Sequence, residues 1–251
     1  MRKLLIFVFA AALLIASCED KQKRTKNSNK NQTQVEATTS NDTTNKDGEA
    51  KADGNKEDSK TDSKPKYPEL TNENAVEFLT QYGKENPENK VLIETELGDI
   101  EIALFEDTPI HRANFIYLVK QNYFEETFFH RVLPDFIIQA GNSDMRSTQE
   151  KRAELGRKYL LPAEIIPGRI HQYGTVSGAK EYRRNPDHRS APYEFFIFLG
   201  PLSSTTHLNG MYTVFGKVTK GMDVVEAISE LERDSEDWPL RNITLKTSII
   251  E

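Results

Sequence analysis

The chain has 251 residues with 33 Lys and Arg against 39 Asp and Glu, a formal net charge of −6. Of these, 13 basic and 10 acidic residues precede residue 67, which leaves 20 basic and 29 acidic residues for the rest of the chain. This acidic balance excludes a nucleic-acid-binding class for the C-terminal part, because contacts to phosphates require clustered cations.

The first 17 residues have the features of a secretory signal peptide. Met1-Arg2-Lys3 is a basic start, and residues 4–16 are a purely apolar run that is too short to span a bilayer. The next residues, Ile15-Ala16-Ser17-Cys18, resemble the lipobox of bacterial lipoproteins, whose cysteine is lipidated and becomes the first residue of the mature protein. The alternative is an ordinary signal peptide that leaves Cys18, the only cysteine, as a free thiol.

The lipobox interpretation predicts a place in the cell. We expect Cys18 to be a lipid anchor in the bacterial cell envelope, in the inner or outer membrane, with the rest of the chain in the periplasm or at the cell surface. Residues 18–66 contain one large apolar side chain, Val35, among many Lys, Asn, Thr, Asp and Ser. Such a segment cannot bury enough apolar surface to fold, so we predict a disordered linker.

Residues 67–89 predict a short helical extension. Thr71 is placed as an N-cap, a helical pattern of apolar residues follows, and Gly83 is placed as the C-terminal stop.

Residues 90–251 predict one mainly β domain. Val91 to Leu104 alternate with a period of two around Gly98-Asp99, which indicates a β-hairpin. Helices are predicted from Thr108-Pro109 and over 222–230, with further strand-like runs at 128–133, 136–140, 175–179, 195–199, 212–218 and 243–250. Many short strands without a βαβ rhythm favour a closed eight-stranded antiparallel β-barrel capped by two α-helices, expected to be a monomer. Residues 143–161 have no clean period and predict a surface loop, and Trp238 is predicted to cover a barrel end.

Several kinds of site are not indicated. The five histidines show no metal-ligand spacing, and the chain has neither a glycine-rich phosphate loop nor a Gly-x-Ser-x-Gly elbow. We therefore expect no metal and no cofactor.

The stretch from Phe129 to Gln139 places a cation among apolar residues. A buried arginine needs partners, so Arg131 either belongs to a site or lies on the solvated face of a half-buried strand. Strand alternation puts Phe129 and Arg131 on one face.

Alternation beyond Pro134 puts Ile137 and Gln139 together on one face. Phe136 falls on the other face unless the bend at Pro134-Asp135 re-aims it. One surface can thus hold a charge, an amide and several apolar groups.

This stretch resembles the hallmark of the cyclophilin family, Phe-His-Arg-x-x-Pro-x-Phe-x-x-Gln-x-Gly. The resemblance continues in order to residue 250, through the first hairpin, Asn114-Phe115 with Leu118, Gly174-Thr175-Val176, Phe195-Phe196-Ile197, Leu208-Asn209-Gly210, Val214-Phe215-Gly216-Lys217-Val218 and Gly221-Met222-Asp223-Val224-Val225.

The resemblance implies a peptidyl-prolyl cis-trans isomerase acting on proline-containing polypeptides, here exported proteins. Carried over by position, it implies catalytic roles for Arg131 and Gln139. It further implies substrate contacts at Phe136, Ile137, Ala179, Lys180, Glu194, Phe196, His207, Leu208 and Tyr212. Rotation about an X-Pro bond breaks no bond, so the reaction needs neither nucleophile nor metal.

Glu194 is the main departure from the family pattern, which has glutamine there. An ionised carboxylate only accepts hydrogen bonds, so Glu194 could pair with Arg131 and restrain it, or favour basic substrates. It is also the feature that favours the alternative function, a non-catalytic chaperone or scaffold that binds proline-containing segments.

Overall fold

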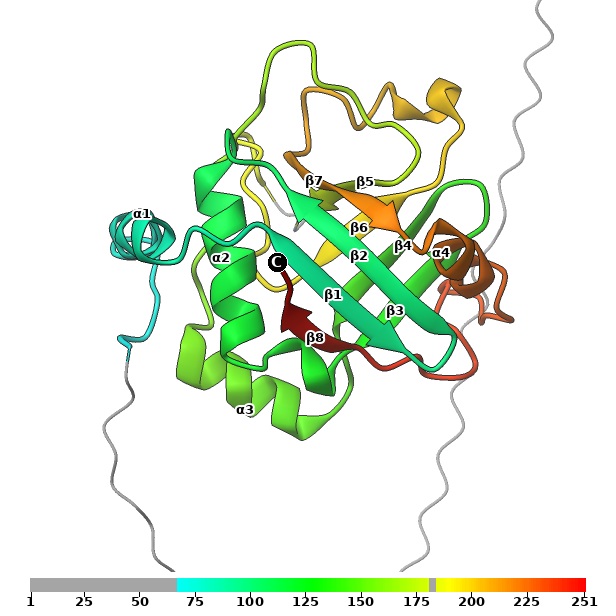
Figure 1. Cartoon of the computed structure of the whole chain (residues 1–251), viewed down its shortest axis with the longest axis horizontal. Helices are drawn as coiled ribbons and strands as arrows, with labels where there is room; N and C mark the ends of the chain where they lie inside the picture. Colours follow the sequence, from blue (N-terminus) through cyan, green and yellow to red (C-terminus); the bar gives the residue numbers. More distant parts are fainter. Residues whose placement is uncertain (1–66, 181–183) are drawn as a thin grey trace, which may run out of the picture. The chain divides into compact units, whose positions relative to one another are not determined.

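Residues 67–180 and 184–251 are described by a computed structural model. Within these ranges eight strands form one antiparallel sheet in the order β3-β4-β6-β5-β7-β2-β1-β8 (Figure 1). The strands are β1 (Lys90–Thr95), β2 (Gly98–Leu104), β3 (Phe128–Leu133), β4 (Ile137–Asn142), β5 (Thr175–Gly178), β6 (Phe195–Phe198), β7 (Val214–Lys220) and β8 (Lys246–Ile249). The predicted signal peptide, the lipid anchor Cys18 and the linker lie outside the described residues.

The predicted hairpin is β1 and β2, and its alternating pattern builds the core. Val91 pairs with Ile102 and Ile93 with Ile100 across the two strands. All four side chains are fully buried. Successive side chains of a strand point to opposite faces, so Leu92 and Glu101, which lie between these four, are on the other face and only partly buried.

The predicted closed barrel is wrong in one respect, because the sheet is open between β3 and β8. These edge strands are joined by an isolated bridge between Phe128 and Thr244 and by two flanking backbone hydrogen bonds, without a continuous ladder. β8 has only four residues, and the chain before it runs along β3 only briefly. The eight antiparallel strands themselves agree with the prediction.

The described residues hold four α-helices, one more than predicted: α1 (Ala75–Glu85), α2 (Pro109–Lys120), α3 (Arg146–Leu155) and α4 (Met222–Ser229), with 3-10 turns η1 (Phe124–Glu126) and η2 (Leu202–Thr205). α3 falls within 143–161, which was predicted as a loop. It buries only Thr148 and Leu155, so no apolar stripe marked it in the sequence.

α1 packs on α2, on the side away from the sheet (Figure 1). Its N-cap is Asn74 and not Thr71, and it continues past Gly83 to Glu85. Gly83 is buried within the helix, where an added Cβ would lie 3.0 Å from Cβ of Ala113. This glycine therefore lets the two helices approach closely and does not end the helix.

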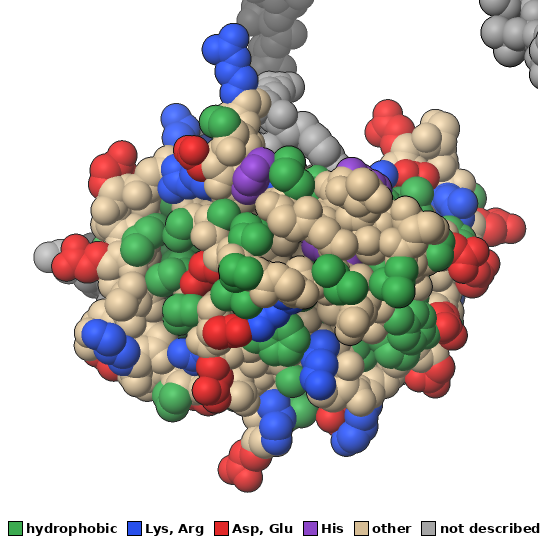
Figure 2. Space-filling model, turned by 90° about the horizontal axis from the view of Figure 1, so that it is seen from above, with side chains coloured by type: hydrophobic (Ala, Val, Ile, Leu, Met, Phe, Trp, Pro, Cys, Tyr) green, Lys and Arg blue, Asp and Glu red, His purple; other side chains and the backbone are tan. Residues whose placement is uncertain are grey.

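Charged side chains of both signs are interspersed over the face shown in Figure 2. In the part of the chain that the structure describes, no helix is long and apolar enough to cross a membrane.

Candidate functional site

Two strands, β4 and β6, each carry residues of two separate apolar clusters. Ile138 and Ile197 belong to the main core, whereas Ile137, Phe196 and Phe198 pack with Leu208 in a second cluster. The division follows from strand alternation, which sends neighbouring residues to opposite faces of the sheet. The second cluster, with the partly buried Leu133, Phe136 and Tyr212 packed against it, forms the apolar part of the site.

Three predicted site residues lie side by side on adjacent strands. Arg131 on β3 is in register with Gln139 on β4, and Gln139 is in register with Phe196 on β6. Directly opposed residues of an antiparallel pair have their Cβ atoms only about 4.5–5.5 Å apart. The sheet therefore presents a guanidinium, an amide and a phenyl ring as one row.

The predicted common face for Phe129 and Arg131 is wrong. Phe129 is fully buried in the main core, whereas Arg131 lines the cavity described below. The register of β3 against β4 shifts between these two residues, and such an irregularity re-aims the side chains after it. As a result His130 and Arg131, which are neighbours in sequence, both line the cavity.

The bend at Pro134-Asp135 re-aims Phe136, which is the exception to strand alternation stated above. Asp135 has a φ of 56°, in the left-handed region that few residues other than glycine adopt. Phe136 consequently lines the cavity beside Ile137 instead of facing away from it.

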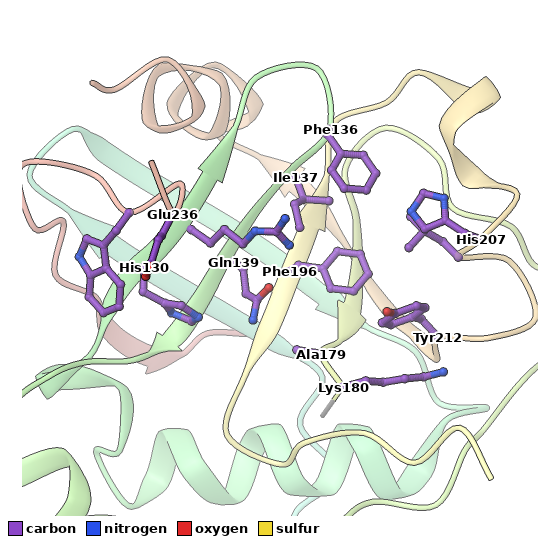
Figure 3. A pocket seen from close by; sticks show the side chains of 13 residues that line it. His130, Phe136, Ile137, Gln139, Ala179, Lys180, Phe196, His207, Tyr212 and Glu236 are labelled. Atoms are coloured by element: carbon purple, nitrogen blue, oxygen red, sulfur yellow. The ribbon is translucent and has the colours of Figure 1, made fainter. Parts of the chain in front are cut away.

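A cavity of about 480 Å³ unites these residues (Figure 3). A volume of this size is ordinary for a ligand-binding pocket. It contains every predicted catalytic or substrate-contact residue except Glu194. Its lining is His130, Arg131, Phe136, Ile137, Gln139, Ala179, Lys180, Phe196, His207, Leu208, Tyr212, Glu236 and Trp238.

Arg131 is half-buried, and among the described residues Asp237 is its acidic partner. Its Nε donates to Oδ2 of Asp237 over 3.3 Å, and its side chain is 35% exposed. The hydrogen bonds among the described residues use none of its Nη atoms. The guanidinium thus keeps donors for a ligand. Sequence reasoning missed Asp237, which is 106 residues away and has no spacing signal.

Glu194 lies behind the cavity wall and does not pair with Arg131. Its Oε2 accepts a hydrogen bond from Gln139 Nε2 at 2.9 Å, and its Oε1 lies 3.5 Å from Arg152 Nη2. Burial raises the pKa of this carboxyl, but the hydrogen bond and charge of His130 and the charge of Arg152 outweigh it, so the pKa lies below its usual value. The pairing with Arg131, one of the two alternatives that the sequence left open, is not formed. Glu194 instead contacts two residues of the cavity lining: Gln139, and His130, whose Nε2 lies 3.6 Å from Oε2 of Glu194.

The loop that supplies Leu208 is fastened by its neighbour Asn209. Oδ1 of Asn209 accepts hydrogen bonds from the backbone N–H and from Nδ1 of His171, both at 2.8 Å. The His171 ring in turn lies parallel to Phe196, with centroids 5.8 Å apart. Two walls of the apolar cluster are thus joined through one buried histidine.

Lys180 borders the other end of the cavity. Its Nζ lies 4.4 Å from the ring centroid of Tyr212, at cation–π distance, and 3.2 Å from Nδ1 of His188. Burial lowers the pKa of this ammonium.

Three cavity residues were not predicted as substrate contacts. Trp238 is predicted to cover a barrel end, and no role is assigned to His130 or Glu236 from the sequence. The ring of Trp238 lies at 5.6 Å, centroid to centroid, from the ring of His130 and lines the cavity, a place that the sequence did not indicate. Figure 3 shows His130 and Glu236 on the opposite side of Gln139 from Phe136, His207 and Tyr212.

A buried group outside the cavity has the bonding pattern of a hydrolytic triad. His111 Nε2 lies 2.9 Å from Ser190 Oγ, and His111 Nδ1 lies 2.6 Å from Glu164 Oε2. Ser190 is fully buried and His111 is 2% exposed, so no substrate can reach the hydroxyl. Glu164 also accepts the backbone N–H groups of Ile110 and His111, which caps the start of α2. The group is structural.

Metal ligation finds no support in the described ranges, where no group of three or more His, Cys, Asp or Glu side chains could hold an ion.

Comparison with known proteins agrees with this geometry. Residues 90–249 match the family model described as "Cyclophilin type peptidyl-prolyl cis-trans isomerase/CLD". A peptidyl-prolyl cis-trans isomerase of Acinetobacter baylyi is 36% identical over 144 residues, 56% of this chain and 72% of that protein. The peptidyl-prolyl cis-trans isomerase-like 3 protein of Dictyostelium discoideum is 33% identical over 161 residues, 64% of this chain and 94% of that one.

Solved structures are similar as well. The crystal structure of a Cryptosporidium parvum cyclophilin-type isomerase has a TM-score of 0.54 and 26% identity, and the match covers 65% of this chain and 98% of that one. The same protein in the presence of the dipeptide Ala-Pro has a TM-score of 0.53. The chain belongs to the cyclophilin-type peptidyl-prolyl cis-trans isomerase family. The predicted family and enzyme class are confirmed.

Proposed function

We propose that this chain isomerises X-Pro bonds of exported polypeptides, with Arg131 stabilising the twisted amide beside an apolar proline pocket. The observation that carries this is the register Arg131–Gln139–Phe196 across three adjacent strands. The second apolar cluster, which includes Phe196 and Leu208, is a slot that suits a proline ring. The similar structure determined with Ala-Pro supports a proline-containing substrate class.

The chemistry follows from amide resonance. Rotation about the C–N bond has a barrier of about 18–20 kcal/mol, because conjugation gives that bond partial double-bond character. A donor directed at the proline nitrogen favours the pyramidal form in which conjugation is lost. The Nη groups of Arg131, which no described residue binds, offer such donors, and a preorganised cation stabilises the twisted state more than the planar one.

Gln139 complements the arginine. Its Nε2 is bound to Glu194, so its Oε1 is left to accept an N–H of the peptide backbone. The cavity thus offers a donor group, an acceptor and an apolar wall. Each of them acts by binding the substrate, and none has to form or break a covalent bond.

The test is isomer exchange measured by NMR on the peptide Ala-Ala-Pro-Phe with the 251-residue chain. Arg131→Ala is expected to lower kcat/KM by about 100-fold or more, the scale of removing one preorganised donor. Arg241→Ala removes an arginine that pairs with Glu96 on the surface and should match the wild type. Equal rates for wild type and Arg131→Ala would refute the catalytic role.

The alternative, a proline-peptide-binding chaperone without catalysis, rested on Glu194. Glu194 is not among the residues that line the cavity, and its carboxylate is engaged by Gln139, Arg152 and His130, which weakens the support for this alternative. Binding of the same peptide without faster cis-trans exchange would nevertheless favour the chaperone function over the enzyme.

We also propose that Cys18 carries the lipid that holds the domain at a membrane of the bacterial envelope. The support is the order of basic start, apolar run and lipobox-like residues before the only cysteine. One acyl chain gives only marginal membrane binding, so more than one is expected. Palmitate labelling of the wild type that is absent in Cys18→Ser supports the anchor, and equal labelling of both refutes it. Size-exclusion chromatography of the chain tests the expected monomer.

A further inference from the structure

The cavity extends to the side of Gln139 opposite Phe136, His207 and Tyr212, into a part that the proposed reaction leaves without a role (Figure 3). We call it the Trp238 arm and define it by His130, Glu236 and Trp238. All three line the same cavity as the residues of the proposed proline pocket (Figure 3). A peptide seated in that pocket therefore has a flanking residue within reach of the arm.

The arm combines an aromatic ring with a carboxylate. Trp238 is half-buried, and its Nε1 donates to Asn242 Oδ1 at 3.2 Å. Glu236 is exposed, and its carboxylate makes no hydrogen bond or ion pair with any of the described residues. An aromatic ring and a carboxylate that no described residue binds, lining one cavity, are a suitable setting for a cationic side chain.

Two other carboxylates near the cavity, those of Asp237 and Glu194, already have cationic or amide partners. Asp237 lies 3.3 Å from Arg131 Nε and 3.8 Å from Arg233 Nε, and Glu194 is engaged by Arg152 and Gln139. Glu236 is thus left to attract a ligand. Residues 232–238 hold four carboxylates and one arginine, so the local field is negative although Arg131 is close.

The arm is held in place before any ligand arrives. Oδ1 of Asp234 accepts the backbone N–H groups of Glu236 and Trp238 at 2.8 and 2.9 Å. The carbonyl of Asp237 accepts the N–H of Val132, on the strand that carries Arg131. Ordering this loop therefore costs little on binding, which favours selectivity.

We infer that the Trp238 arm is a specificity subsite that selects a Lys or Arg side chain on a residue flanking the isomerised proline. This rests on the proposed function and names its preferred substrate class. The ammonium or guanidinium lies against the Trp238 ring and pairs with Glu236. The preference for basic substrates that the sequence suggested for Glu194 is thus assigned to Glu236.

The test compares peptides that differ at one position by lysine or by norleucine, which has the same four-carbon chain without the ammonium group. Proline pentapeptides carry the variable residue at each flanking position in turn, and kcat/KM is measured by NMR exchange with the full chain. At one of these positions lysine is expected to be favoured about three- to tenfold, which is the scale of an exposed ion pair with a cation–π contact.

The variants assign the preference to the arm. Glu236→Gln should bring the lysine-to-norleucine ratio close to one at that position. Glu232 is an exposed residue outside the cavity lining. Glu232→Gln removes the same charge and should leave the lysine-to-norleucine ratio unchanged. Trp238→Leu keeps apolar bulk without the ring and should lower the ratio severalfold.

The outcomes separate the two proposals. Exchange of both peptides at equal rates in the wild type, or a ratio unchanged by Glu236→Gln, overturns the subsite while the isomerase stands. If the wild type exchanges no peptide faster than Arg131→Ala does, the proposed function itself is overturned.

Discussion

Gln139 donates from Nε2 to Oε2 of Glu194 over 2.9 Å, and this contact decides which way its amide faces. An ionised carboxylate only accepts, so the NH₂ group must lie toward Glu194 and the Oε1 atom away from it. The acidic residue that departs from the family's glutamine therefore acts behind the cavity wall. It orients an acceptor and leaves the substrate path open.

Replacing Glu194 should affect activity through Gln139. In Glu194→Ala the amide loses its partner and can rotate, and we expect kcat/KM for Ala-Ala-Pro-Phe to fall about tenfold, the value of one hydrogen bond to a charged group. Glu194→Gln retains an oxygen that accepts from Nε2 and should recover most of that loss. A Glu194→Ala variant as active as the wild type would contradict this role.

Asp237 holds the guanidinium of Arg131 through the contact between its Oδ2 and Nε of the arginine. Asp237→Asn preserves the shape and suits the φ of 67° at this position, because asparagine tolerates the left-handed region. Loss of the charge should let Arg131 sample other rotamers, and kcat should fall about two- to fivefold, in line with a half-exposed ion pair. KM should change less than kcat, since the apolar cluster is untouched. A change confined to KM would instead place Asp237 in substrate binding.

Strand alternation was enough to predict much of the site. Ile137 and Gln139 were correctly placed on one face, because β4 is regular there and period two holds. Phe129 was placed wrongly, since a register shift beside Arg131 leaves no mark in the residue pattern. The positions implied by the family resemblance gather in one cavity apart from Glu194.

Contacts distant in sequence were beyond prediction. Asp237 and Trp238 reach the cavity from a loop after α4, and neither apolar period nor spacing links that loop to β3. The helix α3 was missed for a related reason: its side chains are mostly polar, and it is attached through Thr148 Oγ1, which donates to the carbonyl of Glu126 at 2.8 Å. Tertiary hydrogen bonds, which sequence periodicity does not encode, place both segments.

Gly141 is a position where stability depends on the lack of a side chain. Its φ is 101°, and an added Cβ would lie 2.0 Å from the carbonyl oxygen of Tyr193. We expect Gly141→Ala to lower the free energy of unfolding by about 3 kcal/mol or more, because backbone atoms must move. Gly168 is the control: its φ is 80° with no atom within 4 Å of an added Cβ, so Gly168→Ala should cost only about 1–2 kcal/mol of conformational strain. Urea unfolding of both variants measures the difference, and equal losses would exclude the steric explanation.

Buried His171 should make the fold sensitive to mild acid. Its Nδ1 faces an acceptor, Asn209 Oδ1, so the neutral ring carries its proton there, and the buried Nε2 has no partner among the described residues. Burial lowers the pKa of His171 below its usual 6.5, against the smaller opposing effect of the Asn209 hydrogen bond. The His171 ring therefore binds a second proton more readily in the unfolded chain than in the folded one. The contribution of the neutral ring to the free energy of unfolding is complete above about pH 6.5 and is lost as the pH falls through the pKa of the folded state.

Urea unfolding of the wild type and of His171→Gln between pH 7.5 and 5 measures this contribution. The free energy of unfolding of the wild type should fall below pH 6.5 by up to about 1.4 kcal/mol per pH unit, the limit for one proton. His171→Gln should be less stable at pH 7.5 and should lack this part of the slope. Glu194 does not interfere in this window, because its pKa is lowered from 4.5. A wild type that gains stability on acidification relative to the variant would show that His171 is stabilised in its charged form.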